Sequence, residues 1–212
     1  MKLKNFTNNI KVNNISKKLS VDEFNQIKML IRKENPNSLL SNLNNDILKK
    51  YLNHCASSNS FFLLSCNTKK NIIGYAIFAK KYKFMRNEFS FLFRQILFDQ
   101  IFKFNTKALL NFVLIYTHLE NILTTKKKIL IINENLNLNL FAINREFQSM
   151  GIGKFFLTKC LKIINNYHKF KYLITETFDR RPLLFYLNKM NFKKFCTKIR
   201  FFKNLKVLIY KL

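Results

Sequence analysis

The residues best suited to chemistry in this chain form one short segment, residues 148–154, with the sequence Gln-Ser-Met-Gly-Ile-Gly-Lys. The segment follows an apolar stretch that ends at Ile143 and precedes a stretch in which apolar residues recur at helical spacing. The first N–H groups of a helix have no partner inside it and carry the positive end of the helix dipole. A turn that directs these groups at one point binds an anion such as phosphate. We therefore predict a pyrophosphate site at this segment, here called the 148–154 turn, with the Lys154 ammonium at its rim.

Glycine usage supports this prediction. The chain contains only three glycines, Gly74, Gly151 and Gly153, and two of them lie in the 148–154 turn. Glycine tolerates left-handed backbone and has no Cβ to obstruct a pyrophosphate. The alternative interpretation is that the pair only allows a helix to pack closely on a strand. The segment matches neither G-x-x-x-x-G-K-S/T nor G-x-G-x-x-G, which excludes the two common nucleotide motifs.

The pattern of apolar residues predicts the elements that must position this turn. We expect strands at about residues 11–16, 61–66, 72–79, 129–143 and 172–178, and a final hairpin that joins 192–202 to 206–210. We expect helices from a capping box at Ser20 and Glu23 to a break at Asn35-Pro36, and at about residues 40–54, 152–167 and 181–190.

Residues 84–124 have a different pattern, which is apolar with a polar residue at about every fourth position. That spacing predicts helices with a narrow polar stripe. We interpret the segment as a helical insertion within a single domain that spans residues 1–212. Two roles remain open: a helical pair that packs on the sheet or at a dimer contact, and a lid or interfacial surface for an apolar or lipid-linked substrate.

The composition limits the class of protein. The net charge of +27 indicates either an anionic partner, such as nucleic acid or a phospholipid surface, or the Lys- and Asn-rich usage of an AT-rich genome. Lysines are spread along the whole chain, so nucleic acid is not the favoured partner.

No apolar run is long enough for a secretory signal or a membrane helix, and we expect a cytoplasmic protein. The four cysteines form no C-x-x-C pair and are expected to be buried or unreactive thiols, not disulfides or metal ligands: Cys55, Cys66, Cys160 and Cys196.

The 148–154 turn resembles the signature Q/R-x-x-G-x-G/A of the GNAT superfamily of N-acetyltransferases. Residues 140–147 are similar to the apolar strand that precedes this signature in the family. Residues 179–192 are similar to the downstream motif N-x-x-A-x-x-F-Y-x-K-x-G-F, with one additional residue. Asp179, Pro182 and Asn191 replace its Asn, Ala and Gly, and each suits its place in a capped helix. Residues 37–43 and 60–64 are similar to bacterial members that carry a helical insertion before the fourth strand.

The resemblance implies an α+β fold, with a mixed, mostly antiparallel twisted sheet of about six to seven strands flanked by helices. It implies an acyl-coenzyme A-dependent N-acyltransferase that uses acetyl-coenzyme A as co-substrate and no metal. Pantetheine would run along residues 136–143, and a backbone N–H near Ile143 would polarise the acyl carbonyl. The residues expected at the cofactor are Phe141, Ala142, Ile143, Gln148, Ser149, Met150, Gly151, Ile152, Gly153, Lys154, Asp179 and Lys189.

The resemblance also implies catalytic residues. Tyr186 matches the family tyrosine that protonates the departing thiolate, although a core aromatic residue is the alternative. Asn137 occupies the position where many members carry a glutamate base. Glu134, Glu176 or a water molecule would then accept the proton of the amine, unless Glu176 lies on an exposed strand face. The three histidines show no catalytic spacing and are expected on the surface or in packing: His54, His118 and His168.

The resemblance leaves the acceptor open. An amino sugar and a protein- or RNA-associated amine both suit the sequence. A non-catalytic GNAT-like binding module and a basic nucleic-acid-associated protein are the alternatives, since the strand glutamate is missing and the charge is high. A homodimer is also left open.

Overall fold

The computed structural model describes residues 9–81 apart from 37 and 70, residues 95 and 106, and residues 124–212 apart from 201 and 202. The expected insertion at 84–124 lies outside the described residues, except at Gln95, Thr106 and Thr124. The chain divides into two compact units. The first unit comprises Met1–Phe78 and Asn139–Lys169, and the second comprises Ala79–Leu138 and Phe170–Leu212.

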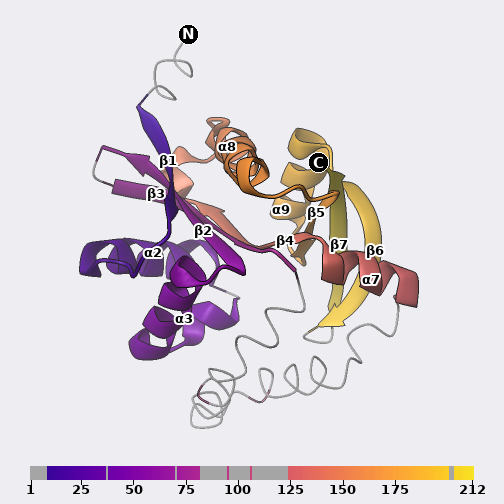
Figure 1. The fold of residues 1–212 in the computed structure, drawn as a ribbon, viewed down its shortest axis with the longest axis horizontal. Coiled ribbons are helices and arrows are strands. Elements are labelled where there is room, and N and C mark those ends of the chain that lie inside the picture. Colours follow the sequence, from indigo (N-terminus) through magenta and orange to yellow (C-terminus); the bar gives the residue numbers. More distant parts are fainter. Residues whose placement is uncertain are drawn as a thin grey trace. The chain divides into compact units, whose positions relative to one another are not determined.

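The described part of the chain contributes seven strands, hydrogen-bonded in the order β1-β2-β3-β4-β5-β7-β6 (Figure 1). Their bounds are Ile10–Ile15 (β1), Phe61–Thr68 (β2), Asn71–Ala79 (β3), Leu136–Ile143 (β4), Tyr172–Thr177 (β5), Lys193–Arg200 (β6) and Lys203–Lys211 (β7). Strand β4 pairs parallel to β5, whereas β1 with β2, β5 with β7 and β6 with β7 are antiparallel. The expected α+β fold with a mixed sheet is therefore confirmed.

Helices α2 (Val21–Glu34), α3 (Asn45–Ser57) and α8 (Ile152–Tyr167) belong to the first unit. Helix α2 begins at the predicted capping box, in which the Glu23 N–H donates to Ser20 Oγ at 3.2 Å and the Ser20 N–H donates to Glu23 Oε2 at 2.9 Å. The helix expected at 40–54 is two elements, the 3-10 helix η1 (Leu39–Asn42) and α3. The Asn44 side chain accepts the N–H of Ile47 at 2.9 Å and so starts α3 as a new helix.

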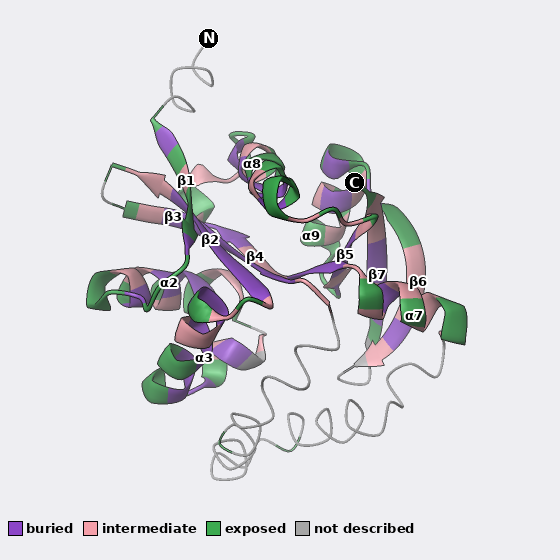
Figure 2. Cartoon of the chain, viewed as in Figure 1, coloured by how far each residue is buried: buried purple, intermediate pink, exposed green. Residues whose placement is uncertain are grey.

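The core of the first unit is formed by strands that are buried on both faces. The first six residues of β2 and the last seven of β3 are all buried (Figure 2). Strand β2 contacts both α3 and α8, which explains the continuous apolar run of β2 in place of an alternating pattern. Three of the cysteines, Cys55, Cys66 and Cys160, are buried free thiols. Burial raises the pKa of Cys66 to about 12, which agrees with an unreactive thiol.

Gly74, the third glycine of this glycine-poor chain, lies in β3 beside Ala142 and Ile143 of β4. A Cβ at this position would lie 2.8 Å from the carbonyl oxygen of Ala142 and would also collide with the side chain of Ile143. Real Cβ atoms do not approach a carbonyl that closely, so the two strands can adopt this spacing only because residue 74 is glycine.

In the second unit, α7 (Lys126–Glu134) corrects the prediction of one long strand over residues 129–143. The first part of that segment is a helix, and β4 begins at Leu136. Ile132 of α7 packs in a buried cluster with Ile174 and Val207. The side chain of Asn135 ends the helix, because its Nδ2 donates to Ile131 O at 2.8 Å and its Oδ1 accepts the Tyr172 N–H at 3.1 Å.

The predicted helix at 181–190 is also two elements, α9 (Arg180–Leu184) and the π-helix η4 (Phe185–Lys189). A π-helical turn holds one more residue than an α-helical turn. It therefore takes up the residue by which this segment exceeds the family motif. Asn191 follows with φ 57°, which is the left-handed conformation that its predicted place after the helix requires.

Among the helices that the structure describes, none is both long enough and apolar enough to cross a membrane.

We predict that Gly74→Ala lowers the stability of the protein by about 1 to 3 kcal/mol, as overpacking does elsewhere. Thermal unfolding measures this as a fall in Tm of roughly 2 to 4 °C for each kcal/mol. Gly153→Ala is the matched control, because residue 153 is helical and alanine favours helices. Unfolding of Gly74→Ala at the wild-type temperature would contradict the close approach of β3 and β4.

Candidate functional site

The 148–154 turn lies directly between β4 and α8 in the first unit. The Asn144 N–H donates to Ile73 O of β3 at 2.8 Å, which fixes the end of β4. The 3-10 helix η3 (Arg145–Phe147) follows, and the Gln148 N–H donates to Arg145 O at 3.1 Å. The predicted strand-turn-helix order is therefore present.

Two residues of the turn have left-handed backbone, Ser149 with φ 66° and Gly151 with φ 74°. Gly151 is the N-cap of α8, and because it has no side chain it cannot cap the first N–H groups of the helix. These groups remain suited to an anion. The backbone at Ser149 was not anticipated, because the signature leaves that position free. A serine there is strained where a glycine would not be.

The residues around the turn are arranged as an anion-binding loop requires. Ser149, Met150, Gly151 and Lys154 are exposed, and residues 149–154 contain no acidic side chain. Ile152 is buried and anchors the start of α8. In β4, Ala142 and Ile143 are buried, and Phe141 stacks on Phe156 of α8 with ring centroids 5.7 Å apart.

Glu34, the last residue of α2, holds the approach to this turn, and sequence analysis did not identify it. Its Oε1 accepts the Arg145 N–H at 3.0 Å, and its Oε2 accepts Gln148 Nε2 at 3.1 Å. Gln148 Nε2 also donates to Ile143 O at 2.6 Å. The Gln148 amide thus uses both of its N–H groups inside the protein. The only sequence signal for Glu34 is an acidic residue at the end of a helix, which has no specificity.

Tyr186 lies in η4 of the second unit and is buried, with 5% of its surface exposed. Burial raises its pKa to about 12, and a side-chain hydrogen bond with Thr175 opposes this shift. Thr175 Oγ1 in turn donates to Leu138 O at 3.2 Å. The Tyr186 ring packs against Phe185 and Phe192. Tyr186 is therefore part of the core and is also a phenol that stays protonated at neutral pH.

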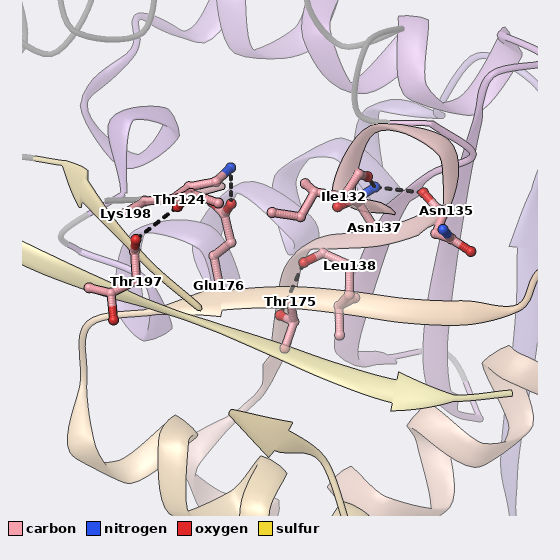
Figure 3. A network of polar contacts seen from close by, with 9 residues as sticks. All are labelled: Thr124, Ile132, Asn135, Asn137, Leu138, Thr175, Glu176, Thr197 and Lys198. Carbon is pink, nitrogen blue, oxygen red and sulfur yellow. Dashed lines mark hydrogen bonds and ion pairs between the residues drawn. The ribbon is translucent and has the colours of Figure 1, made fainter. Parts of the chain in front are cut away.

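Glu176 points away from β5 on the opposite face from Thr175, toward Lys198 of β6 (Figure 3). Lys198 Nζ lies 2.8 Å from Glu176 Oε1. The Lys198 side chain is 2% exposed and the Glu176 side chain 16%. The alternative that Glu176 lies on an exposed face is therefore wrong. A cation this close and this buried favours the ionised carboxylate.

Glu134 is the last residue of α7 and Asn137 lies near the start of β4, and both have partners inside the protein. The Asn137 side chain is buried, and its Nδ2 donates to Ile132 O at 3.0 Å and to Asn135 O at 2.6 Å (Figure 3). An amide in this role supports the loop after α7 and cannot accept a proton from a substrate. Glu134 is the last residue of α7, not part of a strand, and its Oε2 lies 2.7 Å from Nζ of Lys81 in a partly exposed ion pair.

Asp179 and Lys189 belong to the second unit, whereas the 148–154 turn belongs to the first. Asp179 is the N-cap of α9 as predicted, but within the described part of the chain its side chain makes no capping hydrogen bond. Thr177 Oγ1 accepts the Asp179 N–H at 3.2 Å instead. Lys189 is exposed in η4.

Two of the histidines pack edge-on against aromatic rings, as expected of packing residues. His54 contacts Phe61 and His168 contacts Phe62. The third, His118, lies outside the described residues.

Comparisons with known proteins identify the fold. No protein-family model and no curated protein matches the sequence. A polyamine N-acetyltransferase from Drosophila melanogaster, which forms N-acetylagmatine, aligns over 96% of this chain and 100% of its own, with a TM-score of 0.61 and 8% identity. An acetyltransferase from Thermus thermophilus aligns over 95% of this chain and 97% of its own, with a TM-score of 0.54 and 8% identity.

A GNAT family acetyltransferase from Elizabethkingia anophelis, whose structure contains acetyl-coenzyme A, aligns over 96% of this chain and 99% of its own. Its TM-score is 0.52 and its identity 14%. Identities this low carry no information on individual residues, but the alignments cover nearly the whole of each chain. The chain therefore has the fold of the GNAT acetyltransferases.

Proposed function

We propose that this chain is an acyl-coenzyme A-dependent N-acyltransferase that moves an acetyl group to a primary amine. The proposal depends mainly on one observation about the start of α8 in this GNAT-type fold. There, left-handed Gly151 leaves the first N–H groups of the helix without a side-chain cap. This is the arrangement that a pyrophosphate needs.

The residues of the turn fit coenzyme A. The backbone amides of residues 149–154 would hold the pyrophosphate, and the exposed Lys154 adds positive charge in a stretch without acidic residues. The backbone of β4 and the Phe141–Ile143 stretch would accompany the pantetheine. When bound, the thioester supplies an activated acyl carbon. The amine nitrogen forms the new C–N bond to that carbon as the C–S bond breaks.

Tyr186 is the proton donor in this proposal. A phenol is protonated at pH 7 whether or not it is buried, so the Tyr186 O–H can donate a proton to the departing sulfur; burial raises its pKa to about 12 and makes it a weaker acid, so its position is what favours the role. Thr175 and the aromatic neighbours Phe185 and Phe192 hold the ring in place. The role as a core aromatic and the role as an acid are compatible, because the packing fixes the position of the ring and Thr175 contacts its hydroxyl.

Glu176 is the carboxylate best suited to take the proton that the amine loses. Its pairing with buried Lys198 keeps it ionised, and its side chain retains some exposure. Glu134 is tied to Lys81 at the end of α7, and Asn137 cannot act as a base. A water molecule held by Glu176 would serve the same purpose.

The net charge bears on which acceptor the chain would attract. The Drosophila neighbour acts on a polyamine-type substrate, but a chain of net charge +27 repels polycations in solution. An amine on a protein that is bound to RNA would be attracted through the negative charge of the RNA. The same charge supports the alternative of a basic nucleic-acid-associated protein without catalysis.

The first prediction concerns the turn. Gly151→Val introduces a β-branched residue at φ 74° and a side chain where the pyrophosphate would approach. We expect acetyl-coenzyme A affinity to fall at least about 100-fold, close to three kcal/mol. Titration calorimetry of the wild type and the variant measures it, with ATP as an anion control. Unchanged affinity in Gly151→Val, or equal binding of ATP by the wild type, would refute the pyrophosphate site and favour the basic-protein alternative.

The second prediction concerns the acid. Tyr186→Phe removes only the hydroxyl, so turnover should fall roughly 100-fold or more while acetyl-coenzyme A affinity stays within about twofold. Steady-state kinetics and calorimetry on the same preparation measure both. Tyr167→Phe, which removes the same hydroxyl from a tyrosine that is 70% exposed, is the matched control and should retain turnover. Equal turnover of Tyr186→Phe and wild type would exclude Tyr186 as the acid.

The third prediction separates the stability of the buried ion pair from catalysis. Glu176→Gln alone leaves Lys198 buried without its carboxylate and should destabilise the protein by about 3 to 5 kcal/mol. Glu176→Gln with Lys198→Met removes both charges and should recover most of this stability in urea unfolding. If Glu176 is the base, the double variant folds and stays slow. A double variant with wild-type turnover would assign the proton to another group.

A further inference from the structure

We infer that Glu34 is a positioning residue for the 148–154 turn and controls pyrophosphate binding through Gln148. The inference rests on the proposed function, since it concerns the same turn. Glu34 lies more than a hundred residues before the turn in sequence, and both of its carboxylate oxygens accept hydrogen bonds from the turn's approach. One bond comes from the backbone of Arg145 and the other from the side chain of Gln148.

Two hydrogen bonds of the Gln148 side chain connect the end of β4, the end of α2 and the start of the turn. Gln148 Nε2 donates both to Glu34 Oε2 at 3.1 Å and to Ile143 O at 2.6 Å. Glu34 therefore orients the Gln148 side chain, and this side chain spans the loop between Ile143 and residue 148. The next residue, Ser149, is a non-glycine residue with left-handed φ, a conformation that persists where neighbouring contacts enforce it.

The end of α2 is itself fixed, so Glu34 can act as a brace. The Asn35 N–H donates to Ile31 O at 3.0 Å, and Asn35 Nδ2 donates to the Tyr75 hydroxyl at 2.7 Å. Tyr75 is fully buried in β3. The nearby pair of Lys33 with Glu146 is longer, at 3.9 Å, and exposed on both sides, so it adds little.

Because Glu34 is charged, a positioning role and a purely electrostatic role predict opposite changes in anion affinity when Glu34 is neutralised. A carboxylate beside an anion-binding turn opposes anion binding by Coulomb repulsion, so a purely electrostatic account predicts that its neutralisation tightens binding. A positioning role predicts the opposite. In Glu34→Gln one oxygen becomes an NH₂ group, which cannot accept from Arg145 or Gln148.

The experiment compares Glu34→Gln with Glu146→Gln, which removes the same charge from the exposed face of η3 at the same turn. We expect Glu34→Gln to weaken acetyl-coenzyme A binding about tenfold or more and Glu146→Gln to leave it unchanged or slightly tighter. Calorimetry gives the affinities, and thermal unfolding should give both variants a similar Tm. Gln148→Ala removes the other partner and serves if Glu34→Gln folds poorly. Unchanged or tighter binding by Glu34→Gln would overturn the inference.

A second measurement needs no ligand and separates this inference from the proposed function. Amide hydrogen exchange, followed by mass spectrometry on peptides that cover residues 144–154, should become at least about tenfold faster in Glu34→Gln than in Glu146→Gln. If wild-type protein does not bind acetyl-coenzyme A, the proposed function fails, and this exchange alone decides the positioning role. Equal exchange in the two variants refutes it, and faster exchange confined to Glu34→Gln supports it.

Discussion

The left-handed backbone at residues 149 and 151 is the constraint on which the rest of the site depends. Without it, β4 could not turn so abruptly into α8, and the first amides of the helix would not be left to an external anion. In a chain with three glycines, one is placed at the N-cap of α8, and another lets β3 approach the end of β4. Serine at position 149 accepts strain that Gln148 and Glu34 help to maintain.

The second unit meets a different constraint, which is a buried charge. Lys198 of β6 pairs with Glu176 of β5, although β7 lies between these two strands in the sheet. A buried ion pair of this kind contributes little net stability, because desolvation offsets the attraction, but removal of one partner leaves an uncompensated charge. The pair therefore fixes the orientation of Glu176 more than it stabilises the fold (Figure 3). This is what a residue with a chemical role requires.

Much of the fold could be predicted because local signals were strong. The capping box at Ser20, the glycine at the start of α8 and the asparagine after η4 each encode a backbone conformation in one or two residues. The helix α7 was missed, because a short apolar run suits a helix and a strand equally and its Ile132 contacts depend on distant strands. The role of Glu34 also could not be predicted from local sequence, because its partners lie more than a hundred residues away.

The faces of β5 suggest how one fold can manage two proton transfers without a glutamate at position 137. Thr175 holds the Tyr186 phenol on one face, and Glu176 meets Lys198 on the other. A phenol is protonated at neutral pH, and a lysine ammonium 2.8 Å away favours the ionised carboxylate, so each group is in the state its step requires. The amide at position 137 then supports the end of α7, and a third titrating group there would be superfluous.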